Sequence, residues 1–568
     1  MENNAKKLKG CQITIKCLEK MNVDIMFAYP GGCSLELHQA LQESDIRVVL
    51  PRHEQGGAFA AAGYARATGK VGVCMATSGP GATNLITGIA DAYMDSIPTV
   101  FITGQVPLAL IGRNAFQETD FVGMTRPIVK HNYLVLDANE LPRIIKEAFH
   151  IASTGRPGPV LIDIPKNVQQ QLCEANFNFD CDMNIPMYEY NYEVNSDDID
   201  AIKNAIAKSQ KPCIYAGGGI ISAEANAELL EFAEKYNIPV VTTLMGVGGF
   251  PEKHLLSLKW LGMHGTVYGN NAANECDLLL TFGARFDDRV TGPVETFAKD
   301  AKIVHVDIDL SEINKNKVAD IGVVGNIKDI LVELNKQPIY KEYAQWHEQI
   351  AQWKNDFPLT YEVKDDAIQP QYVMEKICEL TNGEAIIVPG VGQHQMWASQ
   401  YYTYSNPRQL LTSGGLGTMG FGTPTAMGAK LACPEKTVIN IDGDGSFQMN
   451  IQELGTIHME EIGMKMVILN NQHLGMVAQW EDRFYGSVRG NTVLKNDKVD
   501  RPYPNFVAIA AGYEIPGCEV YTKEDVEDAI KEMLETDGPF ILDVHTGYQE
   551  HVLPMIPPGK CYKDIITE

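Results

Sequence analysis

The chain has 568 residues, of which 45% are hydrophobic and 21% are charged, and its formal net charge is -25. This length exceeds what one hydrophobic core organises, so we expect roughly two to four domains. The acidic balance disfavours a protein that follows nucleic-acid phosphates, because such proteins present basic patches. The 12 cysteines are scattered without a Cys-x-x-Cys pair, which disfavours a zinc site or a disulfide framework.

The start of the chain, Met1 to Lys9, is short and polar and lacks the apolar stretch of a signal peptide. The chain also lacks the run of about 18 apolar residues that a membrane span requires. We therefore expect a cytoplasmic protein that does not associate with a membrane.

Short apolar runs alternate with helical patterns and glycine-rich turns along most of the chain, which predicts parallel strands joined by crossover helices. Polar connections at 169–197 and 337–369 separate three such segments, and the second connection should hold one helix. We therefore predict an α/β protein with three doubly wound parallel-sheet domains, at residues 1–175, 195–335 and 370–568.

The strands predicted for the first domain are Ile25–Ala28, Val71–Ala76, Thr99–Thr103 and Val160–Ile164. Those predicted for the second are Pro212–Ala216, Pro239–Leu244, Leu278–Phe282 and Ile303–Val306, with a helix at Ala223–Tyr236. Those predicted for the third are Ala385–Val388, Thr437–Ile441, Lys465–Leu469 and Phe540–Val544.

Polar residues follow two predicted strands of the third domain. Gly443-Asp444-Gly445 comes after Thr437–Ile441, and Asn470-Asn471 comes after Lys465–Leu469. In an open α/β sheet such residues meet at the carboxyl edge, where ligands bind. Carboxylate and amide oxygens suit Mg²⁺, and the glycines permit close approach of a phosphate. A helix predicted at Ile451–Glu461 could direct its start toward an anion.

Gly-Asp-Gly alone occurs in many loops, and two unrelated turns would also explain the pattern. With Asn470-Asn471 at this spacing, however, it resembles the motif of thiamine-diphosphate enzymes. That resemblance implies metal coordination by Asp444, by Asn471 and by the backbone carbonyl of His473.

Glu54 follows the apolar run Val48–Leu50 and precedes a helix rich in small residues. Taken alone, such a glutamate is usually a charge at a helix N-terminus. The surrounding sequence from Arg52 to Arg66 resembles the motif in which the same enzymes carry a glutamate that activates thiamine diphosphate. The resemblance therefore implies that role for Glu54.

The resemblance narrows to the acetolactate synthase family and extends over nearly the whole chain. Its most informative piece is Arg285-Phe286-Asp287-Asp288-Arg289, which would otherwise indicate a solvated loop. In the family this run marks the biosynthetic type that contains FAD. Further matching pieces are Tyr29–Gly32, Ala76–Asn84, Gly104–Pro107, Phe116–Glu118, Arg156–Val160, Gly262–Gly265, Gly392–Trp397 and Gly475–Trp480.

The family joins two 2-ketoacids after removing carbon dioxide from one, using thiamine diphosphate, Mg²⁺ and FAD. The resemblance implies thiamine-diphosphate contacts from Glu54, Gln393, His394, Gly417, Met419, Gly443, Asp444, Gly445, Ser446, Asn471, His473, Gly475 and Met476. It implies FAD contacts from Arg156, His264, Gly283, Arg285, Asp307 and Asn326.

The resemblance also implies roles toward the substrates, pyruvate and 2-ketobutyrate. Gly32 would let substrate approach the cofactor, and Gln117 would donate a hydrogen bond to it. The Arg289 guanidinium would hold the carboxylate of the second ketoacid, and Trp480 would pack on its alkyl group. Phe116 and Lys166 would line the access channel, and Met419 would hold the cofactor in a bent form. Without the family, Gly32 would indicate a turn, and Trp480 and Met419 would indicate core residues.

Partners and rival functions follow from the same resemblance. The family places its cofactor between subunits, which implies a homodimer or homotetramer with intersubunit active sites, and it generally has a small regulatory subunit. Pyruvate oxidase shares both organic cofactors but uses the flavin as electron acceptor, and the Arg285–Arg289 run disfavours it. Glyoxylate carboligase lacks the glutamate that Glu54 supplies here. A non-catalytic regulatory paralogue would have lost Glu54, Asp444 or Asn471, which are all present.

Overall fold

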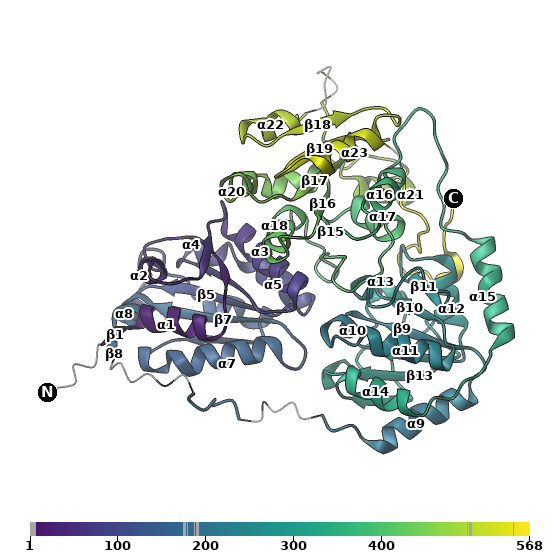
Figure 1. Cartoon of the computed structure of the whole chain (residues 1–568), viewed down its shortest axis with the longest axis horizontal. Coiled ribbons are helices and arrows are strands. Elements are labelled where there is room, and N and C mark those ends of the chain that lie inside the picture. Colours follow the sequence, from purple (N-terminus) through teal and green to yellow (C-terminus); the bar gives the residue numbers. More distant parts are fainter. Residues whose placement is uncertain are drawn as a thin grey trace.

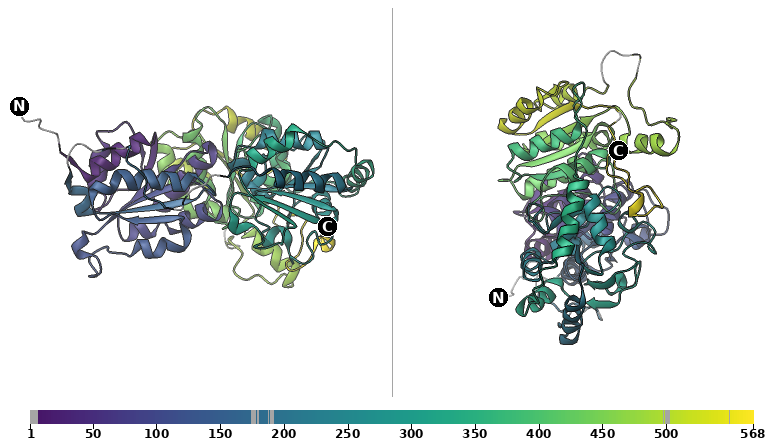
Figure 2. Two further views of the ribbon diagram at one scale, coloured as in Figure 1. Left: turned by 90° about the horizontal axis from the view of Figure 1, so that it is seen from below. Right: turned by 90° about the vertical axis from the view of Figure 1, so that its right-hand side faces the viewer.

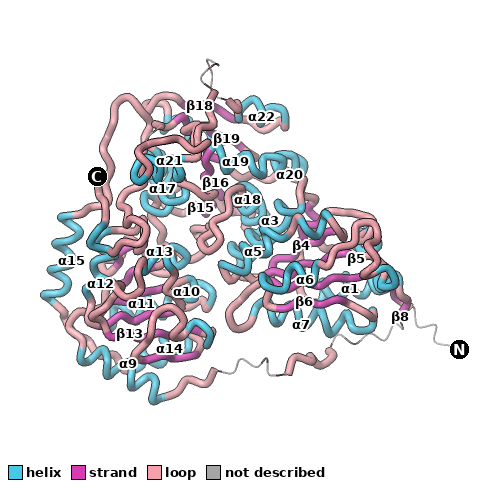
Figure 3. Tube along the Cα trace, turned by 180° about the vertical axis from the view of Figure 1, so that it is seen from behind, coloured by secondary structure: helices cyan, strands magenta, loops and turns pink. Residues whose placement is uncertain are grey.

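Parallel strands organise the computed structural model, which describes residues 7–173, 178, 180–186, 188, 192–496, 498, 503–548 and 550–568. Its sheets have six, six and five strands, and a further two-stranded sheet pairs β1 (Leu8–Lys9) with β8 (Leu172–Cys173). Helices flank the strands of each large sheet, as Figure 3 shows. Within the described residues, none of the helices combines the length and apolarity needed to cross a membrane.

The first sheet has the strand order β3-β2-β4-β5-β7-β6, with every pair parallel. Its central strands β5 and β7 are buried along their whole length, because helices cover both faces. The strands are β2 (Ile25–Ala28), β3 (Arg47–Val49), β4 (Gly72–Ala76), β5 (Thr99–Gln105), β6 (His131–Leu134) and β7 (Pro159–Pro165). The helices are α1 (Gly10–Lys20), α2 (Leu35–Leu41), α3 (Glu54–Thr68), α4 (Pro80–Thr83), α5 (Ile86–Met94), α6 (Phe121–Thr125), α7 (Leu141–Ser153) and α8 (Lys166–Gln170).

The second sheet has the order β11-β10-β9-β12-β13-β14 and is also entirely parallel. Its strands are β9 (Pro212–Ala216), β10 (Val240–Thr242), β11 (Ser257–Trp260), β12 (Leu278–Phe282), β13 (Lys302–Asp307) and β14 (Ile321–Val324). Its helices are α9 (Ser196–Lys208), α10 (Gly218–Ser222), α11 (Asn226–Tyr236), α12 (Val267–Glu275), α13 (Asp288–Thr291) and α14 (Ile327–Lys336).

The third sheet has the order β15-β16-β17-β19-β18. Its strands are β15 (Ile386–Pro389), β16 (Val438–Gly443), β17 (Lys465–Asn470), β18 (Gly517–Val520) and β19 (Phe540–His545). Its helices are α16 (Pro370–Leu380), α17 (Gln393–Tyr401), α18 (Gly422–Ala432), α19 (Asp444–Phe447), α20 (Leu454–Met459), α21 (Gly475–Phe484), α22 (Phe506–Gly512) and α23 (Val526–Glu535). The sheets confirm the predicted α/β class with three parallel sheets.

The connection at 337–369 contains one helix, α15 (Ala344–Asp356), as predicted. Trp346 and Trp353 are buried in the core of the second sheet, and the Trp346 indole N–H donates to the carbonyl of Pro212 at 3.0 Å. In Figure 1, α15 lies on the outer side of this part of the molecule. The connection at 169–197 lies partly outside the described residues.

The prediction of a helix at Ile451–Glu461 is wrong about where the helix begins. A short helix, α19, begins directly at Asp444, a 3-10 segment follows at Gln448–Glu453, and α20 covers only Leu454–Met459. Asn450 interrupts the helix with φ -133° and ψ 29°, and its side-chain amide donates to the carbonyl of Gly420 at 2.7 Å. This hydrogen bond stabilises a kink that periodicity alone does not indicate.

The first and third sheets share a hydrophobic core in which α3 packs against α18. The helices approach closely because glycines face backbone atoms. A Cβ on Gly63 would lie 2.1 Å from the carbonyl oxygen of Thr425, and one on Gly428 would lie 1.9 Å from that of Ala60. In Figures 1 and 2, the first and second domains lie side by side and the third contacts both.

Candidate active site

The carboxyl ends of β16 and β17 meet at one edge of the third sheet. Gly443 lies opposite Leu469, so Asp444 and Asn471 follow at neighbouring positions. Asp444 is 1% exposed, and among the described residues its buried Oδ2 has no hydrogen-bond partner. Burial is the main cause that raises the pKa of Asp444 to about 7. A cation would supply the missing partner and favour the charged carboxylate, so this edge fits Mg²⁺.

A tight turn after β17 orients Asn471. Its Oδ1 accepts a hydrogen bond from the backbone N–H of His473 at 3.0 Å, and Gln472 adopts a φ of 59°. The His473 ring is 4% exposed and packs against Tyr548, with ring centroids 3.7 Å apart. The imidazole is thus part of the packing, which leaves the backbone of His473 as the group that the proposed metal role requires.

The start of α17 lies at the same edge, and two glycines allow its close approach. A Cβ on Gly443 would lie 2.8 Å from His394 Nδ1. A Cβ on Gly475 would lie 2.1 Å from Gln393 Oε1. Gln393 and His394 are 5% and 6% exposed. The structure therefore brings these four predicted residues together beside Asp444.

Ser446 connects this edge to the segment of residues 413–420, which we name the 413–420 loop. The backbone N–H of Gly420 donates to Ser446 Oγ at 3.0 Å. A Cβ on Gly445 would lie 3.8 Å from the terminal methyl of Met419. Gly417 has a φ of 73°, a conformation that favours glycine. Met419 is therefore held next to the Gly-Asp-Gly turn, as its proposed contact with the cofactor requires.

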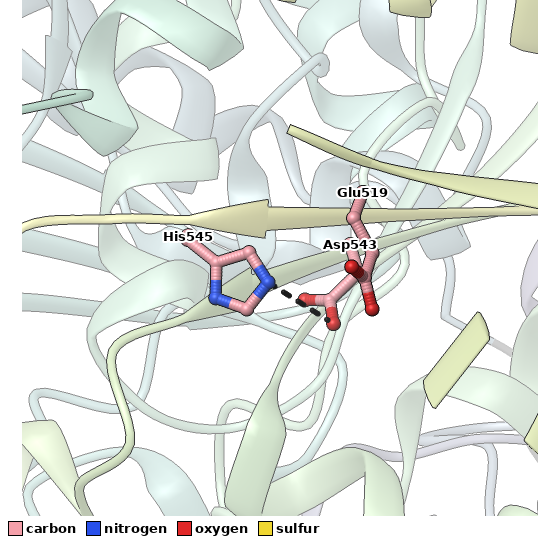
Figure 4. Close-up of side chains that lie close together, drawn as sticks. All are labelled: Glu519, Asp543 and His545. Atoms are coloured by element: carbon pink, nitrogen blue, oxygen red, sulfur yellow. Dashed lines mark ion pairs between the residues drawn. The ribbon is translucent and has the colours of Figure 1, made fainter. Parts of the chain in front are cut away.

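A second group of titratable side chains lies on β18 and β19 (Figure 4). Ligand atoms of Glu519, Asp543 and His545 lie within 4.8 Å of one another. The Asn470 amide donates to both Asp543 oxygens, at 3.0 and 3.3 Å, and the Tyr521 hydroxyl donates to Glu519 Oε2 at 2.9 Å. Because hydrogen bonds engage these carboxylates, we assign Asp543 a supporting role for the end of β17.

Glu54 begins α3 in the first domain and is 9% exposed. The Asn84 amide donates to its Oε2 at 2.9 Å. A Cβ on Gly81 would lie 3.2 Å from its Oε1, so this oxygen faces a backbone without a side chain. The carboxyl group is thus oriented by one amide and is sheltered from solvent.

Four more predicted residues belong to the first domain. A Cβ on Gly32 would meet no described atom within 4 Å, so packing within the chain does not require glycine there. Phe116 is 88% exposed, and Gln117 has a φ of 60°. Lys166 begins α8 and is half-buried. A partner molecule or ligand would explain both the bare Gly32 and the exposed Phe116.

A cavity of about 1400 Å³ lies between residues of all three domains. Its lining includes the predicted residues Arg156, His264, Gly283, Arg285, Arg289, Asp307, Asn326, Gly417, Met476 and Trp480. Arg66 and Arg408 add two further guanidinium groups. The lining also carries the carboxylates Asp95, Asp287, Asp307, Glu312, Asp329 and Glu481. The size of the cavity suits an elongated ligand such as FAD, whose diphosphate an arginine side chain would bind and whose hydroxyl groups a carboxylate would accept from.

The cavity is lined by ionisable side chains that burial and ion pairing affect. Burial lowers the pKa of His264 to about 4 and raises the pKa of Asp307 to about 6. The Arg156 guanidinium donates to Glu312 Oε1 at 2.5 Å, and its Nε donates to Ser96 Oγ at 2.7 Å. Arg156 is thus tied between the first and second domains at the cavity wall.

The cavity lining, among the described residues, does not include the first-domain candidates Glu54, Gly32, Gln117, Phe116 and Lys166. It likewise does not include Asp444 or Asn471. The predicted flavin residues thus line the cavity, together with Gly417, Met476, Arg289 and Trp480, and the predicted metal residues lie at the sheet edge. The substrate candidates of the first domain lie outside the cavity lining.

Sequence reasoning missed several buried charges near these groups. Glu453 is 0% exposed, and its carboxylate accepts the backbone N–H groups of Arg52 and His53 at 3.1 and 3.0 Å, directly before Glu54. Asp91 and Arg66 form a buried ion pair at 2.9 Å. The Glu453 contact joins segments about 400 residues apart in sequence, so local patterns do not indicate it. Arg66 belongs to the motif around Glu54, but its pairing with Asp91 joins α3 to α5 and follows only from the fold.

Comparison with known proteins gives three domain matches. Residues 8–124 match the thiamine pyrophosphate enzyme N-terminal TPP binding domain, 199–334 match the central domain, and 390–544 match the C-terminal TPP binding domain. Acetolactate synthase 1, chloroplastic, of Oryza sativa subsp. japonica is 53% identical over 574 residues, which cover 99% of this chain and 88% of the relative. The chain belongs to the acetolactate synthase family.

Other relatives agree with this membership. Acetolactate synthase, chloroplastic, of Arabidopsis thaliana is 53% identical over 570 residues, covering 99% of this chain and 84% of that protein. Acetolactate synthase 2, chloroplastic, of Zea mays is 52% identical over 570 residues, covering 99% and 89%. The resemblance drawn from the motifs is confirmed. The cofactors of this family are thiamine diphosphate, Mg²⁺ and FAD, and the buried Asp444 edge and the large cavity fit them.

Proposed function

We propose that this chain is an acetolactate synthase of branched-chain amino-acid biosynthesis. It decarboxylates pyruvate and condenses the remaining two-carbon unit with pyruvate or 2-ketobutyrate, giving 2-acetolactate or 2-aceto-2-hydroxybutyrate. The observation that carries this proposal is the pairing of the buried Asp444 edge with the arginine-lined cavity, in a chain 53% identical to acetolactate synthases over 99% of its length.

Binding and proton handling are divided between the third and first domains. Asp444, Asn471 and the carbonyl of His473 would hold Mg²⁺ and, through it, a diphosphate. When bound, thiamine diphosphate supplies an electron sink for the carbon–carbon bond that releases carbon dioxide. Glu54 would hold a proton against the cofactor's aminopyrimidine nitrogen, and Asn84 keeps its carboxyl group oriented.

Recognition of the second ketoacid falls to the cavity. The Arg289 side chain is 63% exposed and lines the cavity, and its Nε lies 3.8 Å from Asp288 Oδ2. Its exposed guanidinium fork would bind the carboxylate of the ketoacid. Trp480 also lines the cavity and packs edge-to-face with Phe484, at 5.9 Å between ring centroids. Gly32 and Gln117 would contact substrate, and Phe116 and Lys166 would line its path.

The flavin has no electron to carry in this reaction. Two molecules of pyruvate give one molecule of acetolactate and one of carbon dioxide, with no net change of oxidation state. FAD would therefore act as a structural ligand of the cavity. A pyruvate oxidase would instead pass electrons to the flavin and consume oxygen.

A pyruvate assay tests the proposal directly. We expect acetolactate to form only when thiamine diphosphate and Mg²⁺ are present, without peroxide. Oxygen-dependent peroxide without acetolactate would establish the oxidase, and no product with bound cofactors would establish a non-catalytic regulatory paralogue. Product from glyoxylate in preference to pyruvate would indicate a carboligase.

Assembly and location are further proposals. A homodimer or homotetramer with sites shared between subunits is proposed from the family type. A small regulatory subunit is proposed from the family type and is testable by co-purification. The cytoplasmic location stays a prediction that cell fractionation tests, whereas the relatives named above are chloroplastic. The domain limits 1–175, 195–335 and 370–568 are likewise proposed, with limited proteolysis as their test.

A further inference from the structure

The 413–420 loop has one end at the large cavity and the other at the Gly-Asp-Gly turn. Ser413, Gly414 and Gly417 line the cavity. At the other end, Gly420 is bound to Ser446 and Met419 lies next to Gly445. The loop therefore contacts both places where the proposed function locates an organic cofactor.

Two carboxylates of the first domain hold this loop. The backbone N–H groups of Gly414 and Gly415 donate to Asp95 at 3.2 and 2.6 Å. The hydroxyls of Ser413 and Thr418 donate to Asp91 Oδ2 at 2.5 and 2.9 Å. The loop's first and last turns are thus both fixed to the end of α5.

A buried guanidinium group joins the two carboxylates. Arg66 donates to Asp91 at 2.9 Å and to Asp95 at 2.8 Å, and also to the carbonyl of Thr412 at 2.9 Å. The side chains of Arg66, Asp91 and Asp95 are 3%, 0% and 0% exposed. Such a desolvated group has a well-defined geometry, because any displacement would leave a buried charge unpaired.

Arg66 and Asp95 are themselves part of the cavity wall. A ligand that fills the cavity would therefore contact Arg66 and Asp95, which also hold the loop. We propose that the 413–420 loop, held by Asp95 and Asp91, couples flavin binding in the cavity to thiamine-diphosphate binding at the Gly-Asp-Gly edge. This inference rests on the proposed function for the identity of the two ligands.

The coupling acts in both directions, because linked binding equilibria are reciprocal. FAD should strengthen the binding of thiamine diphosphate, and thiamine diphosphate should strengthen the binding of FAD by the same factor. A flavin that undergoes no net redox change would then contribute by stabilising the position of the loop that carries Met419. Asp95 and Asp91 are positioning residues, since they act through the loop.

The test is titration calorimetry on the full-length protein stripped of cofactors. The Kd of thiamine diphosphate is measured at saturating Mg²⁺, with and without saturating FAD. We expect FAD to lower this Kd by about tenfold, within the usual range for coupled sites. An unchanged Kd, with binding clearly measured in both arms, would overturn the coupling. Absence of any thiamine-diphosphate binding would instead overturn the proposed function.

Variants locate the coupling in the loop. The coupling is measured by the Kd of thiamine diphosphate without FAD divided by its Kd with saturating FAD. In Asp95→Asn and in Thr418→Val, this ratio should fall toward one. Thr418→Val removes only one hydroxyl donor, so it remains informative if Asp95→Asn folds poorly. Asp307→Asn, at another wall of the cavity, is the matched control and should weaken FAD binding while keeping the wild-type ratio at saturation. Equal ratios in all three variants and the wild type would contradict the role of the loop.

Discussion

At the scale of single residues, Arg289 and Trp480 offer complementary recognition of a 2-ketoacid. A guanidinium fork matches a carboxylate, which every ketoacid carries, so it cannot distinguish pyruvate from 2-ketobutyrate. The two acids differ by one methylene group, and an aromatic wall gains by contacting it. Selectivity between them should therefore depend on Trp480 and not on Arg289.

We predict that Trp480→Leu lowers the preference for 2-ketobutyrate over pyruvate by about tenfold, because one methylene in an apolar site contributes that order of discrimination. The ratio of the two acetohydroxyacid products, formed from mixed substrates, measures the change. Phe484→Leu is the matched control, since Phe484 contacts Trp480 but is not part of the cavity lining. An unchanged product ratio in Trp480→Leu would exclude it from the specificity site.

His264 supplies a prediction about pH. Burial lowers its pKa to about 4 from an ordinary value of 6.5. Between these values the unfolded chain binds a proton that the folded chain excludes. The contribution of His264 to stability is therefore present above pH 6.5 and is lost as the pH falls toward about 4, by about 3 kcal/mol in total.

We expect His264→Gln to lose less stability than the wild type between about pH 7 and about pH 5. Thermal unfolding midpoints across this range measure the difference. His458→Gln is the control, because the His458 side chain is 38% exposed on α20. Equal pH slopes for His264→Gln and the wild type would mean that His264 is not the group responsible.

Residues that carry a local motif could be predicted, and residues that act across the fold could not. Asp444 and Asn471 each follow an apolar strand, so their meeting at one edge follows from parallel pairing. Glu453 and Asp95 contact partners that are distant in sequence, at Arg52 and at Gly415. Only the docking of the first domain on the third brings those segments together.

At the scale of elements, the interior strands could be predicted, as could the fully buried edge strand β15, whereas the other edge strands could not. β12 is buried at every position and reads as a continuous apolar run. The edge strands β6, β14 and β18 are largely half-buried, with few fully buried positions. Partly exposed positions admit polar residues, such as His131 and Asn132 in β6 and Glu519 in β18, so a continuous apolar run does not mark these strands.

The contact between α3 and α18 yields a prediction at this scale. We expect Gly428→Ala to destabilise the protein by about 3 kcal/mol, because the new methyl would overlap the backbone of Ala60 and push the helices apart. Gly512→Ala, at the end of α22, is the control, since a Cβ there would meet nothing within 4 Å. Similar thermal unfolding midpoints for the two variants would show that the helices tolerate a wider separation.

At the scale of the whole molecule, the separation of Glu54 from Asp444 raises the question of whether one active site is built from one chain or from two. Glu54 takes its amide contact from Asn84 in the first domain, whereas Asp444 lies at the edge of the third sheet. A cofactor that touches both must span two domains. If those domains belong to different subunits, each active site of a dimer combines Glu54 of one chain with Asp444 of its partner.

Mixing two inactive variants distinguishes the arrangements. We expect Glu54→Gln and Asp444→Asn each to lower acetolactate formation by at least about 100-fold, because one loses the proton-holding carboxyl and the other loses a metal ligand. Unfolded and refolded together in equal amounts, half of the dimers are mixed. In a mixed dimer with shared sites, one site carries both substitutions and the other carries neither. Activity should then recover to about a quarter of the wild type. If each site is built from one chain, every site keeps a defect, and the mixture stays as inactive as its components.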